Sequence, residues 1–196
     1  MAQVSPHRVD VSAARREPPR WVAWMVAGAL AVTAAGGFAV TAALEDPSGT
    51  PLDIGGAVRV SPLSGWTTVG RAAVDEWTFG RLIRGTGTLD VAVHELPVTA
   101  PGKVARAYLD RFLRRELTRL SVDERLQQVT LASGTVGVRF RYTGFLRDSA
   151  TTIEGEVTAV VTASGAGVAF DASSPDGLLS FVIGDARTMI GDAVIA

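Results

Sequence analysis

The side chains that most often carry out catalysis are scarce in this sequence. Its 196 residues include no cysteine, only two histidines and a single lysine, Lys103. The lack of cysteine excludes disulfides, thiolate metal sites and cysteine nucleophiles. His94-Glu95 is followed by Leu96-Pro97-Val98, so these residues do not form the His-Glu-x-x-His motif of a zinc protease. The other histidine, His7, lies near the N-terminus.

The glycine-rich motifs of nucleotide-binding proteins are also absent. Gly85-x-Gly87 is followed three residues later by Asp90, and Gly102-Lys103 is followed by Val104. Asp90 could orient His94 as a general base, but residues four apart on a strand lie about 13 Å from each other. The sequence therefore predicts no catalytic residue, no cofactor and no metal ligand.

Two charged residues fall on faces that are otherwise apolar. Glu116 lies in the middle of the apolar stripe of a helix predicted over residues 101–121, and Arg81 lies on the apolar face of a predicted strand. Opposite charges in such places indicate a partly buried pair that serves as a structural strut. The alternative is that Arg81 and Glu116 form a polar anchor in a ligand pocket between helix and sheet.

Arginines recur at every fourth position of the same predicted helix, at Arg111, Arg115 and Arg119. Helical geometry places them in one row, where like charges repel by about 0.2–0.5 kcal/mol per pair. An anionic surface such as phospholipid head groups would offset this repulsion. The alternative is a solvated face on which acidic neighbours balance the row.

Apolar spacing predicts two helices. The first runs from Pro101 to about Ser121, and the proline suits its first position. The second follows Ser174-Pro175 and carries an apolar stripe from Leu178 to Ile190.

Alternation of apolar and polar residues predicts the strands. Val58-Arg59-Val60 opens the series. Residues 77–84 and 88–96 form a hairpin in which residue 83 pairs with residue 89. Residues 127–131, 136–142, 153–163 and 168–171 follow as an antiparallel meander. In its central hairpin Arg141 faces Glu154 and Arg139 faces Glu156, on the side opposite to Phe140.

This order of elements implies an α+β domain, with a mainly antiparallel sheet and two helices packed on it. The opening VRVSPLSGW, with its turn from Pro62 to Trp66, together with the element order, resembles the PsbP-like α/β/α sandwich of small extracytoplasmic proteins in high-GC bacteria. The resemblance covers residues 58–193. It implies a docking, accessory or ligand-binding role and no single chemistry. Many such proteins are lipoproteins, whereas this chain has no cysteine to carry a lipid.

The N-terminal part predicts a membrane anchor. Residues 21–44 are 24 residues without a charge, long enough for a transmembrane helix. Arg15, Arg16 and Arg20 precede this run and Glu45-Asp46 follows it, so the N-terminus is expected in the cytoplasm. A cleaved signal peptide is the alternative, although its apolar region is usually about 7–15 residues long.

The expected organisation has four parts. Residues 1–20 form a disordered cytoplasmic tail, residues 21–44 a transmembrane helix, residues 45–57 a linker rich in Pro and Gly, and residues 58–196 an extracytoplasmic α+β domain. The net charge of −1 gives no indication of a nucleic-acid partner. The sequence does not fix the oligomeric state.

These features favour a single-pass membrane protein that acts as a binding or accessory module of the bacterial cell envelope. Its partner would be a protein, an anionic lipid or a wall component. Two alternatives stay open: an envelope hydrolase whose residues converge only in the fold, and a structural subunit of a membrane complex.

Overall fold

The computed structural model describes residues 49–123, 125–147 and 149–196. The predicted tail, membrane helix and first residues of the linker lie outside these ranges. In the described part of the chain, no helix has both the length and the apolar character that a membrane span requires.

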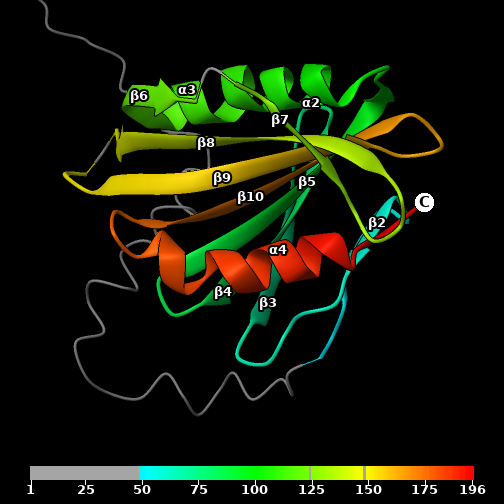
Figure 1. Cartoon of the computed structure of the whole chain (residues 1–196), viewed down its shortest axis with the longest axis horizontal. Helices are drawn as coiled ribbons and strands as arrows, with labels where there is room; N and C mark the ends of the chain where they lie inside the picture. Colours follow the sequence, from blue (N-terminus) through cyan, green and yellow to red (C-terminus); the bar gives the residue numbers. More distant parts are fainter. Residues whose placement is uncertain (1–48, 124, 148) are drawn as a thin grey trace, which may run out of the picture. The chain divides into compact units, whose positions relative to one another are not determined.

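The domain is built on an antiparallel sheet of eight strands (Figure 1). Seven of them follow the order β3-β4-β5-β10-β9-β8-β6, and β7 pairs with β8 beside β6. Their bounds are β3 Thr67–Val74, β4 Trp77–Arg84, β5 Gly87–Pro97, β6 Leu117–Val122, β7 Gln127–Thr130, β8 Val136–Leu146, β9 Thr152–Val161 and β10 Ala166–Pro175. The sheet and its helices confirm the predicted α+β class.

A second, smaller sheet joins segments from the two ends of the described chain. It has the order β1-β2-β11, with bounds Leu52–Ile54, Val58–Val60 and Val194–Ile195. Leu52 and Ile54 are buried against β4, and a Cβ at Gly80 would lie only 2.5 Å from a Leu52 methyl group. The segment expected to be a linker therefore contributes a strand to the domain, whose first strand begins at Leu52 and not at Val58.

One face of the large sheet is covered by a helical segment with three parts. α2 (Pro101–Tyr108) continues through the π-helical turn η1 (Leu109–Leu113) into α3 (Arg114–Glu116). The predicted helix ran to about Ser121, but the chain changes to strand β6 at Leu117. The spacing of Leu113, Leu117 and Leu120 suits a helix, yet residues 117–122 instead pair with β8 and close one side of the sheet.

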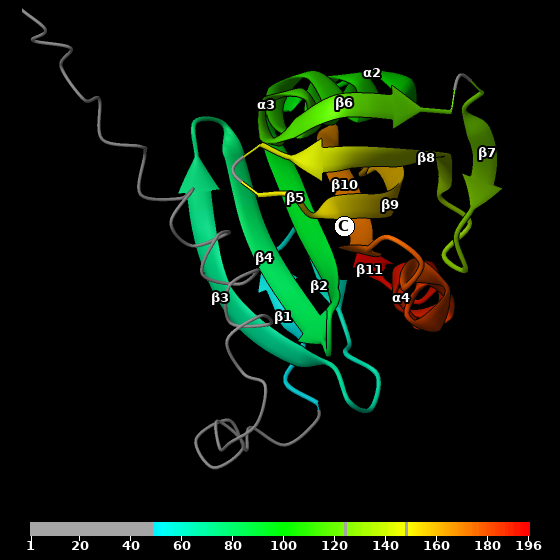
Figure 2. The same ribbon diagram turned by 90° about the vertical axis from the view of Figure 1, so that its left-hand side faces the viewer.

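The opposite face is covered by the small sheet and by α4 (Ile183–Gly191), which follows the 3₁₀ turn η2 (Leu179–Phe181). Figure 2 shows α2 and α4 on opposite sides of the sheet. Ser174-Pro175 was expected to begin the closing helix, but both residues complete β10. The sheet thus separates two cores, one under α2 around Trp77 and Phe112, the other under α4 around Phe170 and Met189.

Two hairpins have registers that differ from those predicted. In β4–β5, Ile83 pairs with Thr88, one residue from the expected partner, because Gly85-Thr86 forms a two-residue turn. Gly85 has a φ of +57°, as a tight hairpin turn of this kind requires. The one-residue shift places Arg81 beside Asp90, so the predicted facing of Ile83 with Leu89 was wrong.

In β8–β9 the shift is two residues, so that Arg141 pairs with Glu156 and Arg139 pairs with Thr158. Since side chains alternate with a period of two, a two-residue shift leaves each side chain on its predicted face. The arginines therefore still lie on the face opposite to Phe140, as the sequence predicted.

Candidate functional site

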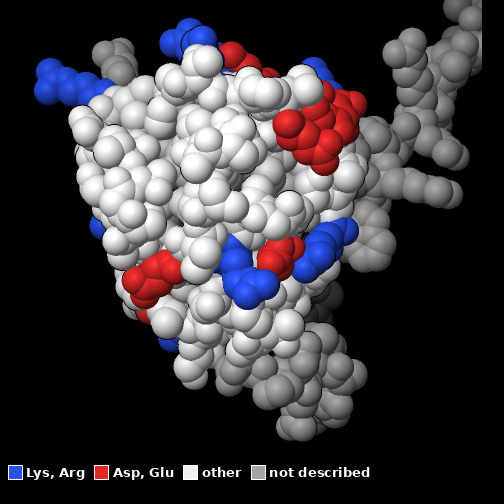
Figure 3. Space-filling model, turned by 90° about the vertical axis from the view of Figure 1, so that its right-hand side faces the viewer, with Lys and Arg blue, Asp and Glu red and all other residues white. Residues whose placement is uncertain are grey.

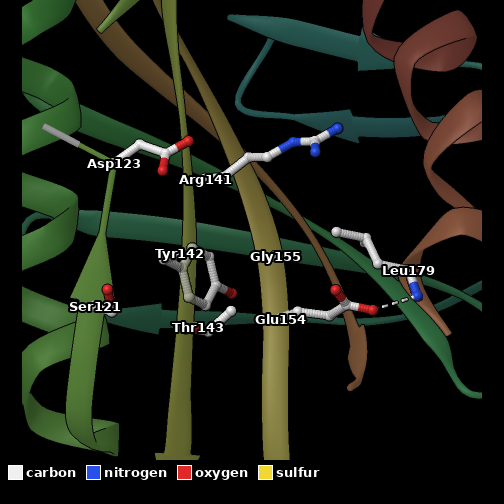
Figure 4. Close-up of a pocket in the computed structure, with 8 residues that line it drawn as sticks. All are labelled: Ser121, Asp123, Arg141, Tyr142, Thr143, Glu154, Gly155 and Leu179. Carbon is white, nitrogen blue, oxygen red and sulfur yellow. Dashed lines mark hydrogen bonds between the residues drawn. The ribbon is translucent and has the colours of Figure 1, made fainter. Parts of the chain in front are cut away.

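The candidate site is a pocket on the α4 side of the sheet, where α4 leaves part of β8 and β9 uncovered (Figure 4). Its volume is about 320 Å³. Its walls and floor come from β6, β8, β9 and η2. The lining residues are Ser121, Asp123, Arg141, Tyr142, Thr143, Glu154, Gly155 and Leu179.

Strand alternation decides which of these residues presents a side chain to the pocket. Arg141 lies on the α4 side, because it shares Glu156 with Arg187 of α4. Tyr142 points to the opposite face, where its hydroxyl reaches Asp171 beneath α2. Its ring lies over Gly155, where an added Cβ would come within 2.4 Å of the ring. Tyr142 and Gly155 therefore contribute backbone to the floor of the pocket.

One wall of the pocket carries the positive charge of Arg141, which belongs to a cluster of three arginines around Glu156. Glu156 is 2% exposed and accepts ion pairs from three arginines: Arg139 Nε at 3.0 Å, Arg141 Nε at 3.0 Å and Arg187 Nη2 at 2.5 Å. Burial disfavours the charged carboxylate, but hydrogen bonds from Arg187 and Arg141 and the charge of Arg139 outweigh it. The pKa of Glu156 is consequently lowered. With Glu156 ionised, this arginine cluster keeps an excess of two positive charges.

The other polar groups of the pocket include two carboxylates. Glu154 Oε1 accepts the backbone N–H of Leu179 at 2.9 Å (Figure 4), and the backbone N–H of Asp123 donates to the Arg141 carbonyl at 2.9 Å. Within the described ranges, neither carboxylate forms an ion pair. The pocket is thus lined by two carboxylates and by Arg141, which connects it to the arginine cluster around Glu156.

A second polar cluster, partly buried, lies on the opposite face, under α2 and η1. Asp171 accepts hydrogen bonds from Tyr108 at 3.0 Å and from Tyr142 at 2.9 Å. Asp90 lies directly opposite Asp171 in the sheet and binds Arg81 through two hydrogen bonds of 2.5 and 2.8 Å. Burial and the charge of Asp90 raise the pKa of Asp171 to about 7, against the opposing effect of the tyrosine hydroxyls.

Arg81 and Glu116 both belong to this cluster, but the ion-pair partner of Arg81 is Asp90. The one-residue register shift of the β4–β5 hairpin brings Asp90, and not Val91, beside Arg81. Burial, Asp90 and Asp171 raise the pKa of Glu116 to about 8, and the positive charge of Arg81 opposes this effect. The sequence identified these two residues by their position on apolar faces, whereas Asp90 and Asp171 were missed as members of the cluster.

The three arginines Arg111, Arg115 and Arg119 do not form the predicted row. Arg111 lies in η1 and forms an ion pair with Asp75. Arg119 lies beyond the end of the helix, in β6, where it has a φ of +49° at a strand irregularity and stacks over Phe145. The three arginines therefore do not share one helical surface, and their contact with anionic head groups stays a prediction.

Another surface is notable for its lack of charge. It is the end of the domain that carries the β7–β8 and β9–β10 turns and the C-terminus, and Figure 3 shows charged side chains mainly along its margins and in one row below its centre. Two exposed apolar side chains in these segments are Val136 and Val194. Its turns carry uncharged polar side chains such as Ser133, Thr135, Thr162 and Ser164, which bond to each other in pairs. The pocket, which gathers charged groups of both signs, is the stronger candidate for specific recognition.

No protein-family model and no curated protein matches the sequence. Among solved structures, the fold is similar to that of the cyanobacterial PsbP (CyanoP) of Synechocystis, with a TM-score of 0.52 and 15% identity over 82% of this chain and 98% of that chain. The predicted PsbP-like fold is thereby confirmed.

Two other solved structures have lower scores. LpqN of Mycobacterium tuberculosis, described as involved in cell envelope biogenesis, gives a TM-score of 0.46 and 13% identity, covering 82% of this chain and 99% of that one. The yeast Ran-binding protein Mog1p gives 0.47 and 12%, covering 75% and 95%.

Proposed function

We propose that this chain is a membrane-anchored binding or accessory module of the bacterial cell envelope, with its α+β domain outside the membrane. The observation that carries this proposal is the uncharged run of residues 21–44, with Arg15, Arg16 and Arg20 before it and Glu45-Asp46 after it. Arginines flanking a span are retained on the cytoplasmic side. This asymmetry supports a position of the C-terminal domain on the opposite side of the membrane.

A bacterial source is supported by residue usage, since Lys103 is the only lysine against 18 arginines and asparagine does not occur. Such usage fits a genome rich in G and C. A binding role is supported by the pocket, which collects charged groups of both signs around a small open volume. Small-molecule sites generally combine a concave surface with a few polar groups of this kind.

The natural lack of cysteine makes the topology directly testable by thiol labelling. Ala150→Cys would place one thiol in the exposed β8–β9 turn, and Ser5→Cys would place one in the N-terminal tail. In intact cells or spheroplasts, a thiol reagent that does not cross membranes should label Ala150→Cys alone. Ser5→Cys should react only after lysis. Labelling of Ser5→Cys in intact cells, with protection of Ala150→Cys, would reverse the orientation and end the proposal.

A further inference from the structure

We infer that the pocket beside Leu179 binds a small zwitterion, a ligand with both an ammonium and a carboxylate, of the free amino acid or short peptide class. This inference rests on the proposed binding function and adds the chemical class of the ligand. It follows from how the charges in the pocket are distributed and from which of them have partners.

The positive wall presents donors that are not used within the domain. Arg141 uses its Nε for Glu156, and its side chain is 56% exposed. Its two terminal nitrogens have no hydrogen-bond partner among the residues that the structure describes. Because Glu156 binds Arg139 and Arg187 as well, it cannot neutralise all three arginines. A ligand carboxylate would complete this wall, since guanidinium groups bind carboxylates through paired hydrogen bonds.

The negative groups of the pocket come from other elements. Asp123 follows β6 and Glu154 lies on β9, and Figure 4 shows them on different sides of the Arg141 side chain. Glu154 is held by the backbone N–H of Leu179, which fixes its carboxylate at the pocket. An ammonium group would satisfy an acceptor of this kind. The hydroxyls of Ser121 and Thr143 can donate to or accept from the rest of the ligand.

Ligands of other charge types fit less well. A simple anion would meet the arginine cluster but would also be repelled by Asp123 and Glu154, and a simple cation would have the reverse problem. A neutral ligand would displace water from charged groups of both signs without supplying opposite charges in its place. The loss of hydration would therefore lower its affinity. A metal ion is not favoured, because the described residues contain no group of three or more His, Asp or Glu suited to hold one. The volume of about 320 Å³ lies at the small end of the range for ligand sites.

The test uses four forms of one dipeptide as probes, with the full-length chain purified in detergent. Alanyl-alanine is a zwitterion, its N-acetyl form is an anion, its C-terminal amide is a cation, and the doubly blocked form is neutral. Isothermal titration should give the tightest binding for alanyl-alanine, by about tenfold over each singly blocked form, since a tenfold change corresponds to about 1.4 kcal/mol.

Variants assign each end of the ligand to one wall. Arg141→Gln should remove the preference for alanyl-alanine over its amide, and Arg141→Lys should retain part of it. Glu154→Gln should remove the preference over the N-acetyl form. Arg114→Gln serves as a matched control, because Arg114 of α3 is an exposed arginine that pairs with Asp110 of η1 and does not line the pocket. Its affinities should equal those of the wild type.

Two results would overturn the inference: similar affinity for all four probes, or no binding of alanyl-alanine by a wild-type chain whose circular dichroism shows it to be folded. Arg141→Gln should also be checked by its thermal melt, and Arg141→Lys supplies the readout if that variant unfolds. Failure here is distinct from failure of the proposed function, because thiol labelling reports the side of the membrane independently of any ligand.

Discussion

At the scale of single residues, the cluster beneath α2 holds more acidic groups than Arg81, its one cation among the described residues, can neutralise. Asp90, Asp171 and Glu116 influence one another, and Arg81 is committed to Asp90 by two hydrogen bonds. Asp171 and Glu116 are therefore left without a cation of their own in a site from which water is largely removed. Removing water from a carboxylate favours its protonated form. The pKa values of about 7 for Asp171 and about 8 for Glu116 follow from this imbalance.

These two carboxyls predict that the domain loses stability as the pH rises from about 4 to 8. Their folded-state pKa values, about 7 for Asp171 and about 8 for Glu116, exceed the unfolded values of 3.8 and 4.5. The folded state thus holds protons that the unfolded state has released. This contribution to stability is fully present below the unfolded pKa values. It then falls by up to about 1.4 kcal/mol per pH unit for each proton, and it is lost once the pH has risen past the folded pKa values.

Urea unfolding of the purified chain at several pH values, followed by fluorescence of the buried Trp66 and Trp77, measures this effect. The free energy of unfolding of the wild type should fall over that range. The double variant Asp171→Asn, Glu116→Gln should show a much flatter profile. Asp176→Asn, which alters an exposed carboxyl, should retain the slope of the wild type. A wild-type profile that is flat between about pH 5 and 8 would contradict the protonated cluster.

At the scale of elements, the strands that the sequence predicted well are those with strict alternation and clear turns. The meander from β7 to β10 was found, and the faces of the β8–β9 hairpin were right although its register differed by two residues. Exact registers depend on the turn, and the sequence could not distinguish a two-residue turn at Gly85-Thr86 from a three-residue loop that includes Gly87. That single choice decided whether Arg81 would meet Asp90.

The sequence did not predict elements whose residues are held in place only by contacts with distant parts of the chain. β3 is exposed along most of its length and shows little alternation. β1 is three residues long and lies between turns, so its composition resembles a linker. The same limit applies to the pocket: Arg187 lies on a helix 31 residues from Glu156 in sequence, and nothing local shows that they meet. Charges on apolar faces did indicate Arg81 and Glu116 as residues of interest.

The role of β1 as part of the domain can be tested by a core truncation. Leu52 is 1% exposed and packs at Gly80 of β4, so Leu52→Ala should lower the free energy of unfolding by about 2–5 kcal/mol. Val69→Ala is the control, because Val69 is a 47% exposed apolar residue of the edge strand β3 and its truncation should have little effect. Equal stability of Leu52→Ala and the wild type in urea unfolding would indicate that residues 52–54 are a linker and not part of the folded domain.

At the scale of the whole molecule, the position of the pocket follows from how the two faces of the sheet are covered. α2 packs over β8, β9 and β10 on one face, whereas α4 packs mainly over β10 on the other. The small sheet covers β4 on that same second face. Part of β8 and β9 is therefore left open beside η2, and side chains directed there need not be apolar. Arg141, Thr143 and Glu154 occupy this open region, which explains why polar residues alternate with core residues along both strands.

A retained membrane span and a cleaved signal peptide can be told apart, because each would leave a mature protein of different length. Cleavage at the small residues Thr41-Ala42-Ala43 would produce a chain that begins at Leu44 and still contains every described strand. The 24 uncharged residues favour retention, since they exceed the usual apolar region of a signal peptide and match the thickness of the hydrocarbon core. The intact mass of the protein isolated from membranes should therefore include residues 21–44, and an alkaline carbonate wash should leave it in the membrane pellet. A control with Val32→Arg and Val40→Arg should release the chain from the pellet, because charges in the middle of a span are costly. A mature protein in the soluble fraction, with the mass of a chain that begins at Leu44, would indicate a secreted protein and contradict the anchor.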